Sequence, residues 1–242
     1  MASFCDTADG QQVEFQRVLA WAGFTDSDIA RIIKEPNLAS TMYASIQPML
    51  GSSMPPWWRT PEQQLARARQ LWPNAVLPEP PAEFTPRTES EVLLLHVPDS
   101  FDSLWDKVLA PEGYTKYRGE GVKSDKRNLR LAPNKVEYTE PVWLAFDPEH
   151  GKGERPDTFW GQTGIAASEI FSALIQFPEW SLAWFNGASA PILTGYQLDY
   201  DGKWSSVPSL FRWNSLPAQL LLLVSWADDR DDGWSSPSVR EC

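Results

Sequence analysis

The second half of the chain holds the side chains best suited to chemistry. His150 lies in a glycine-containing loop, "FDPEHGKGERPD", directly after a predicted strand, where catalytic residues often lie. Carboxylates and an imidazole are groups that bind a metal ion or act as a general base. One hypothesis is therefore a metal-dependent hydrolase or nuclease that uses His150, Glu169, Asp199 and Asp201.

Structural explanations compete with this hypothesis, and the patterns favour them. Asp201 and Gly202 form a dipeptide preferred in tight hairpin turns. The "GKG" at residues 151–153 lacks the spacing of a phosphate-binding loop, and His96 lies inside an apolar run where a structural role is expected. We therefore predict no cofactor and no bound metal, and we favour a non-enzymatic protein.

The acidic stretch "ADDRDDGW" near the end of the chain invites a calcium-loop interpretation. Such a loop needs oxygen ligands at alternate positions and a glutamate at its twelfth position. Counting from Asp228, the third position is Arg230 and the twelfth is Val239, so the pattern fails. We predict a solvated loop that follows an apolar strand.

Charge is distributed unevenly along the chain. The net charge is -11 and the pI is about 4.7, which opposes general attraction to nucleic acid or to anionic membranes. Residues 113–136 nevertheless have a local excess of cations. This segment is predicted to be a solvated loop, a dock for an acidic partner, or a site for RNA or single-stranded DNA. Its candidate binding residues are Lys116, Arg118, Lys123, Lys126, Arg127 and Arg130.

Tryptophan is unusually frequent, with 13 residues in 242. Its large amphipathic ring suits cores and also the centres of protein interfaces. We predict that the chain binds another protein through tryptophan anchors, and the alternative is that the same rings pack inside the fold. The anchor candidates are Trp57, Trp58, Trp180, Trp184 and Trp234.

The N-terminal part of the chain has helical patterns. Residues 11–46 predict three short helices, and a DNA-binding helix-turn-helix is not favoured because the third carries no Lys or Arg. "TPEQQLARARQLW" predicts a helix with a capping box between Thr60 and Gln63. We expect a helical domain over residues 1–72, followed by a proline-rich linker over residues 73–90.

The remainder, residues 91–242, predicts a mixed α+β domain. "EVLLLHVP" and "PVWLAFDP" are typical of buried strands, whereas residues 101–109 and "GIAASEIFSALIQF" have helical periodicity. "PEWSLAWFNG" predicts a further short helix in which Trp180 stacks on Trp184. The last part alternates as strands, so the predicted fold class is α+β with an antiparallel C-terminal sheet.

The sequence also bears on location. No charged-then-apolar leader opens the chain, and no apolar run approaches the roughly 20 residues that cross a bilayer. Its two cysteines, Cys5 and Cys242, have no metal-like spacing. We therefore expect a cytoplasmic protein that does not bind membranes.

Several segments resemble uncharacterised bacterial proteins that are associated with plasmids and other mobile elements. They are "WAGFTDSDIARIIKEPNLASTMYASI" near the start, and "PVWLAFDP", "FPEW", "GYQL", "VPSLFRW" and "SPSVRE" in the second half. The resemblance covers about half of the chain and depends on aromatic and proline positions. It implies an accessory role in a bacterial mobile element or defence system, and it assigns no site residue.

Overall fold

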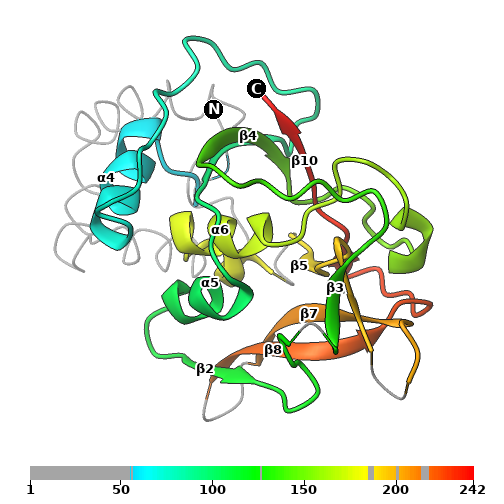
Figure 1. Ribbon diagram of the computed structural model, residues 1–242. Helices are drawn as coiled ribbons and strands as arrows, with labels where there is room; N and C mark the ends of the chain where they lie inside the picture. Colours follow the sequence, from blue (N-terminus) through cyan, green and yellow to red (C-terminus); the bar gives the residue numbers. More distant parts are fainter. Residues whose placement is uncertain (1–54, 56, 126, 185–187, 200–201, 214–217) are drawn as a thin grey trace, which may run out of the picture. The chain divides into compact units, whose positions relative to one another are not determined.

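The computed structural model describes residues 55, 57–125, 127–184, 188–199, 202–213 and 218–242 (Figure 1). The chain divides into two compact units, Met1–Ser53 and Met54–Cys242. All of the first unit lies outside the described residues, and so does the predicted helical bundle over residues 11–46. The second unit contains both helices and sheets, as the α+β prediction requires.

Helix α4 (Pro61–Leu71) begins with the predicted capping box. The Thr60 hydroxyl accepts a hydrogen bond from the Gln63 amide, and the Gln63 side chain accepts one from the Thr60 amide at 2.8 Å. Leu65 and Ala68 are buried. The helix therefore has one apolar face that another element must cover.

The boundary between the two units lies earlier than the sequence predicts. We expected a helical domain that ends at residue 72, but α4 belongs to the second unit and contacts strand β1 (Val92–His96). The local pattern of α4 specified a helix correctly. It could not specify the partner of its apolar face, which is a strand about 30 residues further along the chain.

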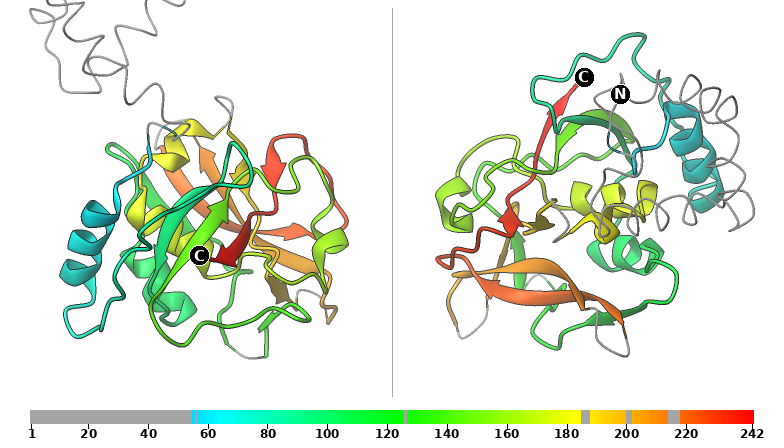
Figure 2. Two further views of the ribbon diagram at one scale, coloured as in Figure 1. Left: turned by 90° about the horizontal axis from the view of Figure 1, so that it is seen from above. Right: turned by 180° about the vertical axis from the view of Figure 1, so that it is seen from behind.

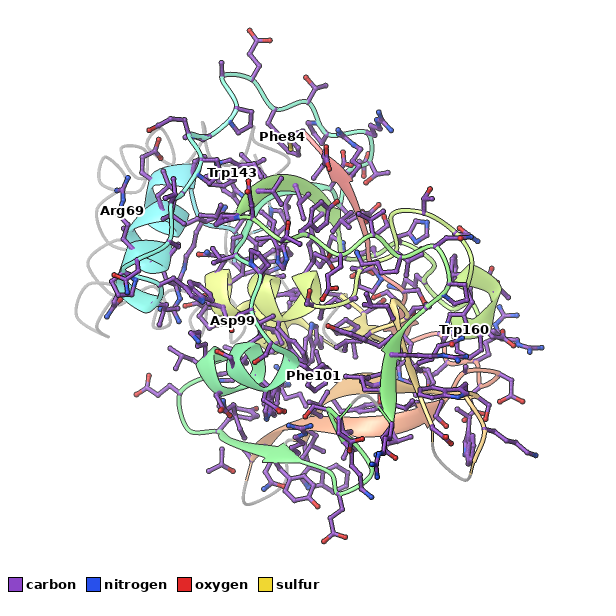
Figure 3. The ribbon with its side chains drawn as sticks, viewed as in Figure 1. Arg69, Phe84, Asp99, Phe101, Trp143 and Trp160 are labelled. Carbon is purple, nitrogen blue, oxygen red and sulfur yellow. The ribbon has the colours of Figure 1, made fainter. Side chains whose placement is uncertain are left out.

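The proline-rich segment 73–90 packs on the second unit and does not connect two domains. Leu77 and Phe84 lie against the small core that α4 forms with β1. The indole Nε1 of Trp143 donates a hydrogen bond to the carbonyl oxygen of Pro78 at 3.0 Å, and Phe84 lies close to Trp143 (Figure 3). The linker prediction is therefore wrong for this segment, because its apolar side chains have partners on the sheet.

Three antiparallel strands form the first sheet, in the order β1-β4-β10. Strand β4 spans Val142–Asp147 and strand β10 spans Ser238–Glu241. The predictions of buried strands at β1 and β4 are confirmed. Strand β10 was not predicted, because its sequence has little apolar alternation and it is ordered by pairing with β4.

This sheet is buried on both faces, which explains the unbroken apolar run of β1. Val92 and Leu94 point into the main core beside helix α6. Leu93 and Leu95 point to the opposite face, into the small core with α4. Successive side chains of a strand alternate between faces, so both sets must be apolar here.

Helix α6 (Glu169–Gln176) is buried along its whole length. It lies between the three-stranded sheet and helix α5 (Phe101–Lys107), and it contacts both (Figure 1). The predicted core residues are confirmed, because Ile170, Phe171, Leu174 and Ile175 are all buried. A helix that is buried on every side needs a packing partner on each side, and its polar residues need partners there too.

Helix α5 matches its prediction except at the end. Its predicted apolar face also included Leu109, which lies beyond the helix and is 51% exposed. Phe101 connects three elements, because its ring centroid is 5.0 Å from that of Phe171 and 5.4 Å from that of Tyr196. The buried positions are Phe101, Leu104, Trp105 and Val108.

Five strands form the second sheet, in the order β2-β8-β7-β6-β3. The C-terminal strands β6, β7 and β8 pair antiparallel, as predicted. The edge strand β2 was not predicted to join them, and it pairs parallel to β8. The strand bounds are β2 Thr115–Arg118, β3 Leu129–Leu131, β6 Tyr196–Leu198, β7 Ser206–Trp213 and β8 Gln219–Trp226.

Strand β7 continues through Pro208. This proline lies inside the strand, and its carbonyl oxygen accepts a hydrogen bond from the Leu193 amide at 2.8 Å. Strand β7 pairs with β6 through Leu198 and Ser206. The short elements are the 3-10 helix η2 (Pro156–Phe159), helix α7 (Trp180–Ala183) and the parallel pair β5 (Ala190–Pro191) and β9 (Trp234–Ser235).

We predict that Gly195→Ala destabilises this fold by about 1–3 kcal/mol, because overpacking forces the backbone to move. An added Cβ would lie 2.6 Å from the Cβ of Ala167 and 2.7 Å from the carbonyl oxygen of Ala166. Urea unfolding measures the loss. Gly119→Ala is the matched control, since its Cβ meets only the side-chain Cδ2 of Leu223 as closely as 3.2 Å. Equal losses in the two variants would contradict the prediction.

Candidate functional site

Two of the predicted anchors, Trp57 and Trp58, are half-buried against the main core. The Trp57 ring centroid lies 5.5 Å from that of Phe177 and 5.9 Å from that of Trp180. The indole Nε1 of Trp58 donates a hydrogen bond to the carbonyl oxygen of Leu93 at 3.2 Å. Both rings therefore help to hold the start of the second unit on the sheet.

The other predicted anchors also belong to the packing of the fold. Trp180 and Trp184 are fully buried, and their ring centroids lie 5.5 Å apart. The predicted contact is therefore present, but the rings meet edge to face and do not stack, because Trp184 lies just beyond the end of α7. A partner on the surface of this unit cannot reach either ring. Trp234 is half-buried, and its ring centroid lies 5.7 Å from that of Phe211.

The predicted catalytic residues each have structural surroundings of their own. The Nδ1 atom of His150 lies 2.9 Å from the carbonyl oxygen of Ser236. Glu169 is buried inside α6, Asp199 follows strand β6, and Asp201 lies outside the described residues. Within the described part of the chain, no group of three or more His, Cys, Asp or Glu side chains is placed to hold a metal ion.

The most deeply buried ion pair among the described residues is that of Glu169 with Lys135. The Lys135 Nζ lies 2.6 Å from the Glu169 Oε1, and both side chains are almost completely buried. The Glu169 Oε2 accepts a hydrogen bond from the Ala167 amide at 2.6 Å. Burial opposes the charge of Glu169, but the ammonium of Lys135 and the other neighbours outweigh it and hold its pKa below the usual range.

His96 and Ser172 lie beside this pair. The His96 Nδ1 and the Ser172 Oγ are 2.8 Å apart, and each residue is 1% exposed. Burial lowers the pKa of His96, so the imidazole is neutral near neutral pH, even though the nearby Glu169 favours its charge. Burial and the charge of Glu169 raise the pKa of Tyr138 to about 12. A substrate cannot reach the serine in this arrangement, so the cluster connects β1 to α6 as a structural network.

The basic segment is largely turned toward its own fold. The Lys116 Nζ donates to the carbonyl oxygen of Trp105 at 2.7 Å. The Arg118 Nε donates to the carbonyl oxygen of Val122 at 2.7 Å. Arg130 lies over the Trp204 ring, with 4.1 Å between its Cζ and the ring centroid. Of the other predicted binding residues, Lys123 and Arg127 are exposed, and Lys126 lies outside the described residues.

An aromatic row crosses three strands of the five-stranded sheet. Tyr117 on β2 pairs with Leu221 on β8, and Leu221 pairs with Phe211 on β7. Residues that pair directly across strands share a face of the sheet. Trp213 on β7 and Leu223 on β8 lie two residues further along their strands, so they share this face, which we call the outer face.

Around β2 and the C-terminal end of β7, the outer face is exposed and carries no charged side chain. Further back along β7, Val207 and Ser209 on the same face are fully buried. Tyr117 is 46% exposed and Trp213 is 55% exposed. The inward-facing residues of β8, such as Leu220 and Leu222, belong to the main core on the opposite side. In the views of Figures 1 and 2, the sheet lies at one side of the second unit, and helices α5 and α6 lie on its inner side.

Sequence reasoning missed this face for an identifiable reason. The run "QLLLLVSW" places leucines on both faces of β8, so the sequence alone does not show which leucines are buried. Tyr117 lies about 100 residues before its partner strand. The signal in the sequence was the alternation of Phe211 and Trp213 with Leu210 and Arg212, which is too short to identify the exposed side.

A shallow hollow borders the acidic stretch that begins at Ala227. The side chains that line the hollow include charges of both signs, and one of them, Trp226, is 42% exposed. Further along, the Asp231 carboxylate accepts a hydrogen bond from the Gly233 amide at 2.7 Å, so this aspartate stabilises a turn. The lining residues are Lys203, Ser205, Trp226, Asp228 and Asp229.

No protein-family model, no curated protein and no solved structure matches this chain. The resemblance to proteins of mobile elements and the cytoplasmic location both stay predictions. Among the described residues, no helix has the length and apolar character needed to cross a membrane.

We predict that Lys135→Met lowers the free energy of unfolding by about 3–5 kcal/mol, because it leaves the Glu169 carboxylate buried without a counter-charge. The double variant Lys135→Met/Glu169→Gln should recover most of this loss. In the double variant the side-chain amide oxygen at position 169 still accepts the hydrogen bond from the Ala167 amide, and no buried charge remains. Urea unfolding of the three proteins measures both effects, and a double variant as unstable as the single one would contradict the explanation.

As the pH falls, the contribution of Glu169 to stability should change in opposite directions in the natural protein and in Lys135→Met. In the natural protein the pKa of Glu169 is lowered, so its stabilising contribution is present above the ordinary glutamate range and disappears as the pH falls. In Lys135→Met, burial alone raises this pKa, so protonation at low pH relieves the penalty. The stability difference between the two proteins should therefore shrink as the pH falls from 7 toward about 4. A difference that stays constant would show that the ion pair is not its cause.

Proposed function

We propose that this chain is a non-enzymatic accessory protein that binds another protein, and that the outer face of the five-stranded sheet is the contact surface. The observation that carries the proposal is the row of Tyr117, Leu221 and Phe211, which continues to the exposed ring of Trp213. Aromatic residues are enriched in protein interfaces, whereas charged residues are depleted from interface centres. A role in a bacterial mobile element or defence system remains the prediction that the resemblance gives.

Two observations weigh against the other functions considered. Lys116 and Arg118 donate hydrogen bonds inside the fold, which removes two cations from a nucleic-acid interpretation, and the chain has a net charge of -11. The serine and histidine that lie within hydrogen-bonding distance, Ser172 and His96, are both buried. The exposed aromatic face is the feature that these internal contacts leave unexplained.

The test is an affinity purification of the tagged protein from its native host, with nuclease treatment and mass spectrometry of the co-eluting proteins. We expect a stoichiometric protein partner that survives the nuclease. The double variant Tyr117→Ser/Trp213→Ser should weaken this complex by about 30-fold or more, because truncation of a central aromatic residue costs about 2 kcal/mol or more. Binding of the purified partner, measured by calorimetry, gives this ratio.

Val76→Ser is the matched control, because Val76 is 88% exposed and lies outside the outer face. It should leave the complex intact. Both variants should keep the unfolding midpoint of the natural protein, since exposed substitutions change stability by about 0.5 kcal/mol or less. A partner that binds the double variant as tightly as the natural protein would exclude the outer face, and recovery of nucleic acid alone would overturn the proposal.

A further inference from the structure

Strand β2 forms an open edge of the five-stranded sheet, directly beside the outer face. It stands at the end of the strand order and pairs only with β8 among the described strands. The Thr115 amide donates to the carbonyl oxygen of Ala218, directly before β8, at 3.0 Å, and the Gly119 amide donates to that of Leu222, inside β8, at 2.8 Å. Amides alternate in direction along a strand, so those of Lys116 and Arg118 point away from β8.

The side chains that protect such an edge in other proteins are turned inward here. Edge strands commonly carry lysine or other charges that discourage pairing with another chain. The Lys116 Nζ donates to the carbonyl oxygens of Trp105 and Asp106, at 2.7 and 2.9 Å. Arg118 forms an ion pair with Asp102 and lies over the Phe101 ring. Both cations are therefore held on the inner side of the sheet, and the backbone of β2 is left accessible from its edge.

We infer that the partner adds an extended segment to the β2 edge, as a further strand of the five-stranded sheet. This inference rests on the proposed function and specifies how the partner binds. A strand in this position places every second side chain on the outer face beside Tyr117, where apolar residues extend the aromatic row. The partner segment therefore alternates apolar and polar residues.

The residues that follow β2 indicate the charge of the partner segment. Among the described residues of 119–130, the cations Lys123, Arg127 and Arg130 are exposed, and so are the carboxylates Glu120 and Asp125, which leaves a small local excess of positive charge. Lys123 follows Val122, whose carbonyl oxygen is bound by Arg118 at the end of β2, so it lies close to that end of the edge. Acidic residues in the partner beyond the C-terminal end of β2 complement these cations.

The charges of β2 disfavour a second copy of this chain as the occupant. Two β2 edges that paired antiparallel across a two-fold axis at Tyr117 would place Lys116 of one copy opposite Arg118 of the other. Like charges placed opposite one another oppose such pairing. A different protein with an apolar and acidic extended segment avoids this repulsion.

The experiment is the selection of a displayed library of short random peptides on the full-length protein, followed by amide hydrogen exchange of the complex by NMR. We expect enriched peptides with alternating apolar residues and Asp or Glu at one end. Bound peptide should slow exchange of the Lys116 and Arg118 amides by about tenfold or more. The Tyr117 amide, which points toward β8, should change little and is the internal control. N-methylation of peptide amides at alternate positions should abolish binding in one register and be tolerated in the other.

Each other outcome overturns the inference in a distinguishable way. Peptides that bind without protecting the Lys116 and Arg118 amides would refute strand addition and leave the outer face as the contact surface. Protection of these amides without peptide, together with a dimer in sedimentation, would assign the edge to a second copy. If no peptide is enriched, the inference fails, and the affinity purification with Tyr117→Ser/Trp213→Ser still decides the proposed function independently.

Discussion

Burial of helix α6 on every side is the constraint on which the other elements depend. All of its residues from Glu169 to Gln176 are buried, so the helix needs the three-stranded sheet on one side and α5 on the other. Phe171 takes part in this packing, because it contacts Phe101 of α5. A carboxylate inside such a helix requires a counter-charge, and Lys135 supplies it from outside the helix.

The two faces of the five-stranded sheet differ, because only the inner face contributes to this core. On β2, Lys116 and Arg118 reach inward to α5, where backbone carbonyls and Asp102 satisfy their charges. Burial of apolar surface accounts for the inner leucines of β8. On the outer face, Trp234 contacts Phe211, but the rings of Tyr117 and Trp213 stay exposed. This asymmetry connects the core to the proposed binding surface.

Most of the tryptophans predicted as partner-binding anchors pack inside the fold. Trp180 and Trp184 fill the core, and Trp57 packs on Trp180 from the start of the unit. These rings fix the arrangement of α6, α7 and the first sheet. Trp213 is different, because it lies on the outer face and stays exposed. Its environment, and not its residue type, makes it a binding candidate.

The sequence by itself determined the elements whose signals are local. The capping box of α4, the apolar runs of β1 and β4, and the buried face of α6 follow from neighbouring residues, because hydrogen bonding at helix ends and side-chain periodicity act over a few positions. Only the tertiary structure decided which unit α4 joins, that "SVRE" becomes strand β10, and that Tyr117 meets Leu221 on an exposed face. Those outcomes depend on pairing between segments far apart in the chain. Which face of a strand is buried depends on the elements that pack against it.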